Sequence, residues 1–149
     1  METNVSNMRG VKEIHVMPYS HHDYAWTNSR EWHIRRYIKS FDEMLEAMRR
    51  NDDFTWMIDN VIHSLLPYIE HCPDRFEEMK MRVREGRIYV ANGGYSLARS
   101  TYVGGETFIR NMVEGKRFMQ TAFGIGNMEF FYNADTGCGH SQLPQLLRL

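Results

Sequence analysis

Short apolar runs alternate with long amphipathic stretches along this 149-residue chain, and that alternation constrains the fold more than any other feature. The apolar runs predict strands at residues 13–17, 54–58, 88–91 and 128–132. The stretches between them have apolar positions at helical spacing, and they predict helices at 29–50, 62–69, 73–86 and 106–123. Each connection is long enough to return the chain for a parallel strand. The sequence therefore predicts a parallel α/β fold in the order βαβαβαβ.

Two architectures are compatible with this pattern, a doubly wound sheet and a β/α barrel. The first, third and fourth runs are short and apolar, as expected of strands covered on both faces. Four strands cannot close a barrel. The sequence stops at Leu149, inside a further helix that is predicted to start at Ser141. We therefore expect either a small open sheet or the front part of something larger.

Composition excludes several classes of protein. Apolar residues make up 42% and charged residues 25%, which is ordinary for a globular protein, and a net charge of −1 gives no broad basic surface for nucleic acid. No apolar run approaches the length of a membrane span, and the first residues lack a secretory pattern. Two cysteines cannot form a disulfide framework. We expect a cytoplasmic protein with no nucleic-acid partner and no membrane span.

Polar residues follow the predicted strands, at the sheet edge where parallel α/β folds carry their sites. His21 and Asp23 follow the first run, Asp59 the second, Tyr95 the third and Asp135 the fourth. In an extended segment, residues two apart point the same way, so His21 and Asp23 could bind one cation, with Asp135 as a third ligand. Nitrogen and oxygen ligands suit zinc, with manganese, iron or cobalt as alternatives. The alternative is that His21 and Asp23 are solvated loop residues.

The other candidate residues have simpler interpretations. His15 is predicted to be a packed core histidine and His22 to have a structural role, while His33, His63 and His71 are expected on helix surfaces or at an interface. Trp26 is either a platform for a sugar ring or a core tryptophan. Cys138 is better explained as a buried thiol than as a metal ligand, and His140 as a helix-capping residue.

Four motifs occur in order along almost the whole chain. They lie in segments 15–26 (His-Val-Met-Pro-Tyr-Ser-His-His-Asp-Tyr-Ala-Trp), 83–95 (ending Asn-Gly-Gly-Tyr), 105–118 (beginning Gly-Glu-Thr-Phe-Ile-Arg) and 133–147 (beginning Asn-Ala-Asp-Thr-Gly-Cys-Gly-His-Ser). The first resembles the H-S-H-x-D-x-x-W motif of the family 38 glycoside hydrolases, the retaining α-mannosidases. The others are similar to that family's G-G-W segment, its G-E-S-x-x-R helix and its D-x-F-G-H/Y-S motif.

The resemblance implies a role for each matching position. His21 and Asp23 would be zinc ligands, Asp135 both a zinc ligand and the catalytic nucleophile, and one Zn²⁺ would serve each active site. Trp26 would pack against the sugar. We also expect Asp59 and Tyr95, at the ends of the second and third strands, to line the substrate site. A further zinc-binding histidine and the acid/base carboxylate come from later sequence in the family.

The resemblance also implies a fold and a function. Residues 1–149 would form the first four βα units of a seven-stranded parallel β/α barrel, an incomplete barrel that is the amino-terminal portion of the catalytic domain. The parent would be a zinc-dependent retaining α-mannosidase that cleaves terminal α-D-mannosides through a covalent glycosyl-enzyme. Its partners would be an α-mannoside or oligosaccharide substrate and the remainder of the catalytic domain. The chain alone is expected to be inactive.

The sequence departs from the family pattern at four points, and two alternatives stay open. Tyr19 and Tyr95 replace a histidine and a tryptophan, an acidic residue is missing after Tyr95, and the Asp135 motif has one extra residue. The first alternative is a zinc-dependent hydrolase resembling a polysaccharide deacetylase, which would use a metal-bound water and a general base. The second is a non-catalytic, sugar-binding relic.

Overall fold

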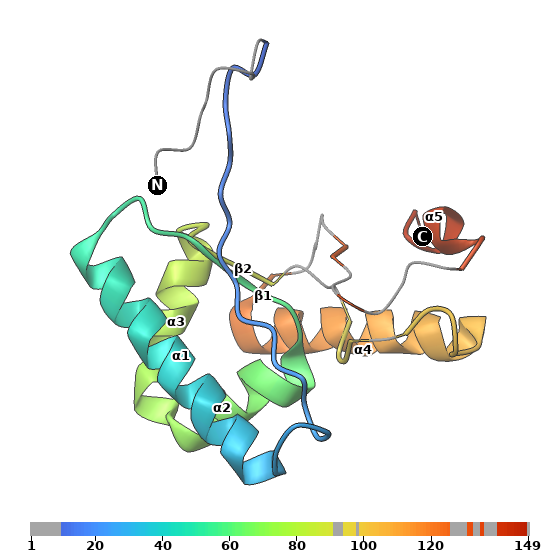
Figure 1. Cartoon of the computed structure of the whole chain (residues 1–149), viewed down its shortest axis with the longest axis horizontal. Coiled ribbons are helices and arrows are strands. Elements are labelled where there is room, and N and C mark those ends of the chain that lie inside the picture. The colour runs from blue at the N-terminus through green and yellow to red at the C-terminus, as the bar shows by residue number, and fades with distance from the viewer. Residues whose placement is uncertain are drawn as a thin grey trace.

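The computed structural model describes residues 10–90, 94–97, 99–125, 131–132, 135 and 140–148. Its elements, shown in Figure 1, are α1 (Arg30–Arg50), β1 (Trp56–Ile58), the π-helix η2 (Val61–Leu65), α2 (Leu66–His71), α3 (Pro73–Arg84), β2 (Ile88–Val90), α4 (Gly105–Phe123) and α5 (Leu143–Leu146). None of these helices is both long and apolar enough to cross a membrane.

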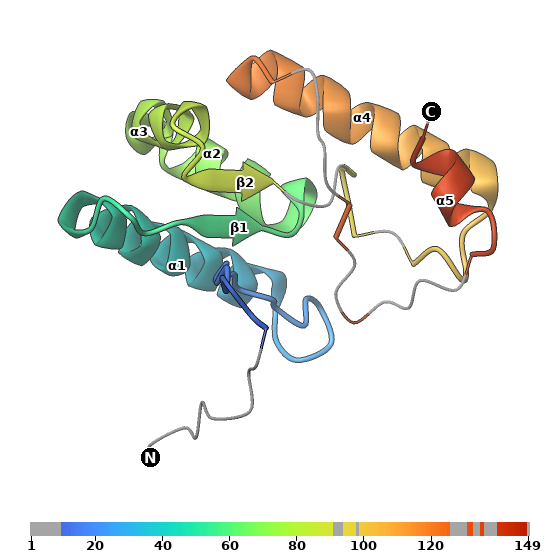
Figure 2. The ribbon, with the colours of Figure 1, turned by 90° about the horizontal axis from the view of Figure 1, so that it is seen from above.

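The two strands run parallel and side by side (Figure 2), with Trp56 opposite Ile88 and Ile58 opposite Val90. Strand β1 forms backbone hydrogen bonds on both of its sides. Trp56 N donates to Arg87 O at 2.8 Å, and Met57 N donates to Pro18 O at 2.9 Å. An isolated parallel bridge joins Tyr19 to Met57. The predicted α/β class with parallel pairing is therefore confirmed, whereas a four-unit portion of a seven-stranded barrel stays a prediction.

The predicted first strand at 13–17 is wrong, because pairing begins only at Pro18. None of the described residues pairs with the backbone of 13–17, and Ile14 and Val16 are 61% and 79% exposed. His15 is not a core residue either: its ring lies 3.4 Å from Glu13 and is 83% exposed. An apolar run becomes a strand only where another backbone satisfies its hydrogen bonds.

The predicted fourth strand, 128–132, lies mostly outside the described residues. Phe131 and Tyr132 are described, and neither belongs to a strand.

The helices agree more closely with the sequence pattern. The Ser29 side chain caps α1 by accepting from Trp32 N, and α4 ends at Gly124, whose φ of 74° is the left-handed conformation that glycine favours. The helix predicted at 62–69 is not a single α-helix: its first part is the π-helix η2, and α2 follows directly. Such π turns occur frequently at functional sites.

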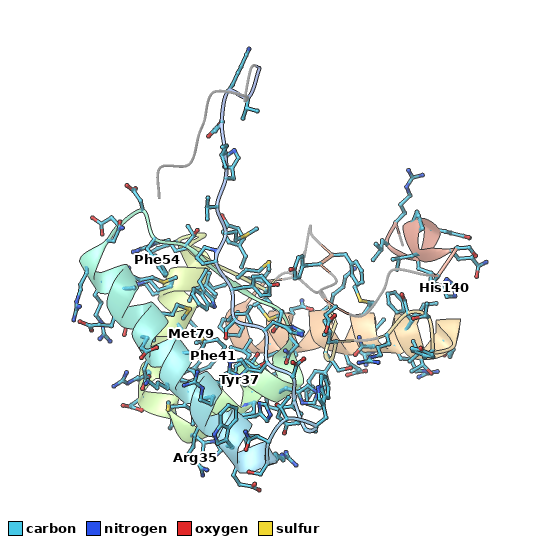
Figure 3. The ribbon with its side chains drawn as sticks, viewed as in Figure 1. Arg35, Tyr37, Phe41, Phe54, Met79 and His140 are labelled. Carbon is cyan, nitrogen blue, oxygen red and sulfur yellow. The ribbon has the colours of Figure 1, made fainter. Side chains whose placement is uncertain are left out.

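The core lies between the strands and helices α1, α2, α3 and the end of α4; α1, α2 and α3 gather on one side of the strand pair (Figure 1). Figure 3 shows Tyr37, Phe41 and Met79 grouped beside α1, with Arg35 at the outer edge of α1. Ile58 and Ile88 join this core, whereas Tyr89 is 40% exposed. Among the described residues, the helices thus cover one face of the strand pair, whereas the run that forms β2 was expected to be covered on both faces.

Candidate metal centre

The structure brings His21, Asp23 and Asp135 together. Each offers one ligand atom, and these atoms all lie within 4.8 Å of one another. His21 and Asp23 lie just after Tyr19, which forms the isolated bridge to Met57 of β1. Asp135 is more than 100 residues later in the sequence. One imidazole nitrogen and two carboxylates form a mixed donor set of the kind that zinc accepts, as do manganese, iron and cobalt.

A buried carboxylate lies behind the first of these residues. His21 Nδ1 is 3.1 Å from Asp59 Oδ2, while His21 Nε2 is 4.0 Å from Asp23 Oδ1. Asp59 is only 2% exposed, and its other oxygen, Oδ1, accepts from Asn60 Nδ2 at 2.8 Å. Burial raises the pKa of Asp59, although its hydrogen bonds to His21 and Asn60 oppose that rise. The Asp59 carboxylate is thus held by neighbouring protein groups on both oxygens.

A cavity adjoins these side chains. Its lining residues are His21, His22, Tyr24, Trp26, Tyr37, Asp59, Asn60, His63, Leu97, Arg99 and Asp135. The Trp26 residue is 65% exposed and therefore offers an accessible apolar ring at this cavity. Trp26 therefore lies outside the core of the described residues, and its contact with a sugar ring stays a prediction.

Tyr95 is not among the residues that line the cavity in the described part of the chain. Its ring packs edge-on against Phe118 of α4, with the ring centroids 6.1 Å apart. Leu97 and Arg99, on the same loop, line the cavity, and a substrate role for Tyr95 stays a prediction.

Asn111 of α4 holds this loop in place. Its backbone oxygen accepts from Tyr95 N at 3.0 Å, and its side-chain oxygen accepts from Ser96 N at 2.8 Å and from Ser96 Oγ at 3.0 Å. Its amide nitrogen donates to Ser96 O at 2.9 Å. The loop that carries Leu97 and Arg99 is thereby anchored to a helix.

Of the histidines expected at the surface or an interface, His33 is buried and His63 is half-buried. His33 is 1% exposed, and its Nε2 lies 3.2 Å from Thr27 Oγ1. His63 lines the cavity and stacks on Tyr24 with ring centroids 4.2 Å apart. Burial lowers the pKa of His63, and the positive charge of Arg30 lowers it further. His63 follows Asn60 by three residues. This closeness to the polar end of the second predicted strand was the sequence signal that could have placed His63 at the cavity.

His22 contributes packing, in keeping with its predicted structural role. Its ring stacks on Tyr37 with centroids 3.9 Å apart, and its Nε2 lies 2.9 Å from Ser20 Oγ. Burial is the main cause that lowers the pKa of His22, followed by its neighbours His33, Arg36 and His21.

His140 lies beside α5 in Figure 3, where its Nδ1 accepts from Gln142 N at 3.2 Å, a turn-stabilising contact like the predicted cap. Cys138 lies outside the described residues.

Two residues of the site region adopt a positive φ without being glycine. These are Ala25, with φ 79°, immediately before Trp26, and Asp135, with φ 55°. Aspartate tolerates this left-handed conformation better than most residues do, whereas alanine does not. Both angles occur where the backbone turns a candidate side chain toward the cavity region.

Comparison with known proteins gives a family match over nearly the whole chain. The model described as the glycosyl hydrolases family 38 N-terminal domain matches residues 12–149. Alpha-mannosidase G of Dictyostelium discoideum is 26% identical over 142 residues, which cover 95% of this chain and 13% of that protein. Alpha-mannosidase 2C1 of Homo sapiens is 25% identical over 138 residues, covering 90% of this chain and 13% of that protein.

A solved structure has the same local fold. The crystal structure of an alpha-mannosidase from Enterococcus faecalis V583 superposes with a TM-score of 0.76 at 26% identity. The match covers 89% of this chain and 15% of that one. The chain therefore spans only a small part of the length of the proteins it matches.

Proposed function

This chain belongs to the family described as the glycosyl hydrolases family 38 N-terminal domain, and on that premise we propose that residues 1–149 supply the metal-binding and nucleophilic part of an α-mannosidase. The observation that carries the proposal is the approach of His21, Asp23 and Asp135, whose ligand atoms lie within 4.8 Å of one another beside an exposed Trp26. The α-mannoside substrate is inferred from the relatives, which are named alpha-mannosidases.

In this proposal, His21, Asp23 and Asp135 hold one Zn²⁺ per active site. When bound, the zinc ion would orient the hydroxyl groups of the mannose ring and stabilise developing charge. The donor set fits this ion, since zinc takes histidine nitrogen and carboxylate oxygen and keeps an open position in catalytic sites. Trp26 would pack its exposed ring against an apolar face of the sugar.

Asp135 would act as the nucleophile of a retaining mechanism. A carboxylate oxygen of Asp135 forms a bond to the anomeric carbon as the glycosidic C–O bond breaks, and the leaving oxygen takes a proton from a general acid. Water then cleaves the glycosyl-enzyme with the same residue acting as base, so that configuration is retained.

The general acid is not assigned to any described residue. Asp59 also lines the cavity, but it is buried, and its two oxygens contact His21 and Asn60. Retaining chemistry needs a second carboxyl group about 5–5.5 Å from the nucleophile. We therefore propose that the acid comes from the remainder of the catalytic domain and that the 149-residue chain alone is inactive.

The family match favours glycoside hydrolysis over the deacetylase alternative. A second candidate function, sugar binding without turnover, is supported by the loop after β2. There Tyr95 packs on Phe118 outside the cavity, and Arg99, from the segment that lacks the acidic residue of the family pattern, lines the cavity.

The test measures metal content and hydrolysis of an aryl α-mannoside, on this chain and on the longest reading frame that contains it. We expect about one zinc ion per chain in both proteins and turnover only in the longer one, with Asp135→Asn abolishing that turnover. Absence of zinc from both proteins, with no effect of His21→Ala, would contradict the proposal. Mannose binding by the longer protein without turnover would establish the second candidate, and acetate release from an acetylated sugar would establish the deacetylase.

A further inference from the structure

Asp59 is a buried carboxylate whose two oxygens face two different partners. It directly follows Ile58, the last residue of β1, and is 2% exposed. Oδ1 accepts from Asn60 Nδ2 at 2.8 Å, and Oδ2 lies 3.1 Å from His21 Nδ1. A carboxylate so removed from water is stable only where such partners satisfy it. Its position is therefore determined by the protein around it and not by solvent.

Asn60 is itself held by the π-helix that follows β1. Its side-chain oxygen accepts from His63 N at 3.0 Å, and its backbone oxygen accepts from Ser64 Oγ. The Asn60 amide group is thereby oriented with its nitrogen toward Asp59. Strand β1 and helix η2 thus help to orient the Asp59 carboxylate that contacts His21.

The contact determines which nitrogen of His21 carries a proton. An ionised carboxylate only accepts hydrogen bonds, so Nδ1 of His21 is the donor. The neutral ring then has its lone pair on Nε2. That nitrogen lies 4.0 Å from Oδ1 of Asp23, which is one of the three clustered residues.

We infer that Asp59 is a positioning residue for the metal centre, which holds the His21 ring in place and leaves its Nε2 unprotonated toward the cation. The inference rests on the metal function proposed above. It gives Asp59 a different role from substrate contact, since Asp59 is not one of the three clustered ligands and acts through His21. Carboxylates behind metal-binding histidines commonly have this effect.

The substitution Asp59→Asn separates this role from simple packing. Asn60 and His21 both present a donor to residue 59, and a carboxamide has only one oxygen to accept with. If that oxygen keeps the bond to Asn60, the amide nitrogen faces His21 Nδ1, which must then accept. The proton moves to Nε2, where it blocks the proposed ligand atom. In contrast, Asp59→Glu retains two accepting oxygens.

The first measurement is the tautomer of His21 in the metal-free chain, from the ¹⁵N chemical shifts of its ring nitrogens. We expect the Nδ1–H form in the wild-type chain and in Asp59→Glu, and the Nε2–H form in Asp59→Asn. An Nε2–H ring in the wild-type chain overturns the inference without any variant, so the test stands even if Asp59→Asn fails to fold.

The second measurement is zinc affinity, determined by competition with a chelator for chains whose thermal unfolding shows that they are folded. We expect Asp59→Asn to weaken zinc binding about 10–100-fold, and Asp59→Glu to restore a large part of that loss. Asp42→Asn is the matched control, because Asp42 accepts from Tyr68 Oη and Arg75 Nη1 away from the cavity, and it should leave both readouts unchanged.

The substitution His21→Ala distinguishes failure of the Asp59 positioning role from failure of the metal site itself. If His21→Ala lowers zinc affinity while Asp59→Asn changes neither the affinity nor the tautomer, the positioning role is wrong and the metal site stands. Equal losses in Asp59→Asn and Asp59→Glu with an unchanged tautomer likewise overturn it, since they indicate packing alone. If His21→Ala leaves zinc affinity unchanged, the proposed metal function itself fails.

Discussion

Asn111 of α4 lies so close to Gly94 that a Cβ atom at residue 94 would collide with the Asn111 side-chain amide. The same Cβ would lie 3.0 Å from Ser96 O, whose position is fixed by the Asn111 amide. The Asn-Gly-Gly-Tyr sequence after β2 therefore has a local structural reason: the second glycine lets the loop approach a helix closely. The same loop continues to Leu97 and Arg99, which line the cavity.

The first prediction is that Gly94→Ala destabilises the chain by about 1–3 kcal/mol, because the added methyl group forces the loop or Asn111 to move. Gly105→Ala is the matched control: nothing lies within 4 Å of its Cβ position, at the start of α4. That control should be neutral or stabilising by up to about 1 kcal/mol, since alanine is the better helix former. Urea unfolding measures both, and equal stabilities of the two variants would contradict the close approach.

The second prediction concerns the turn before Trp26. Ala25 has a φ of 79°, which costs a non-glycine residue about 1–2 kcal/mol, so Ala25→Gly should raise the free energy of unfolding by about 0.5–1 kcal/mol. Ala47→Gly, inside α1, is the control and should lower it by a similar amount. Thermal or urea unfolding shows whether each substitution raises or lowers the free energy of unfolding. A loss of stability in Ala25→Gly would exclude strain at this turn.

The third prediction is a pH dependence that belongs to His63. Burial and the nearby Arg30 lower the pKa of His63 in the folded chain, and the stacked Tyr24 encloses its ring. The unfolded chain, with a histidine pKa of about 6.5, then binds more protons than the folded one as the pH falls. The contribution of neutral His63 to stability is thus fully present above about pH 6.5 and is lost as the pH falls toward its lower folded pKa.

Urea unfolding of the wild-type chain and of His63→Gln over about pH 5–7.5 tests this sign. The variant should lose less stability on acidification. His22, whose pKa is also lowered, remains in both chains, so the difference between the two curves reports His63. Parallel curves would show that His63 does not carry the effect.

The fourth prediction is that zinc stabilises the folded chain through the three clustered side chains. A ligand that binds only the folded state at about 100 times its dissociation constant adds about 2.7 kcal/mol. The unfolding temperature should therefore rise with added zinc and fall back on chelation. His21→Ala should abolish this rise. His71→Ala is the control, because His71 contacts Pro67 O in α2 and is not part of the cluster. An equal rise in both variants would indicate zinc binding elsewhere.

Local sequence pattern was sufficient for the long helices. The predicted boundaries 29–50 and 106–123 differ by one residue from those of α1 and α4, because apolar spacing and end residues such as Ser29 and Gly124 act within a few turns. The same reasoning failed for 13–17. A helix satisfies its own hydrogen bonds, whereas a strand depends on a partner elsewhere in the chain, and the described residues provide one only from Pro18 onward.

The sequence by itself determined the family and the parallel α/β class. It also predicted that His21 and Asp23, two residues apart, lie close enough to bind one cation. Only the tertiary structure decided that Asp135 reaches them, that Asp59 turns its carboxylate to His21, and that Tyr95 packs on Phe118 outside the cavity. The physical reason is range. Spacing fixes the direction of side chains along one short segment, whereas burial and contact between distant segments depend on how the elements pack.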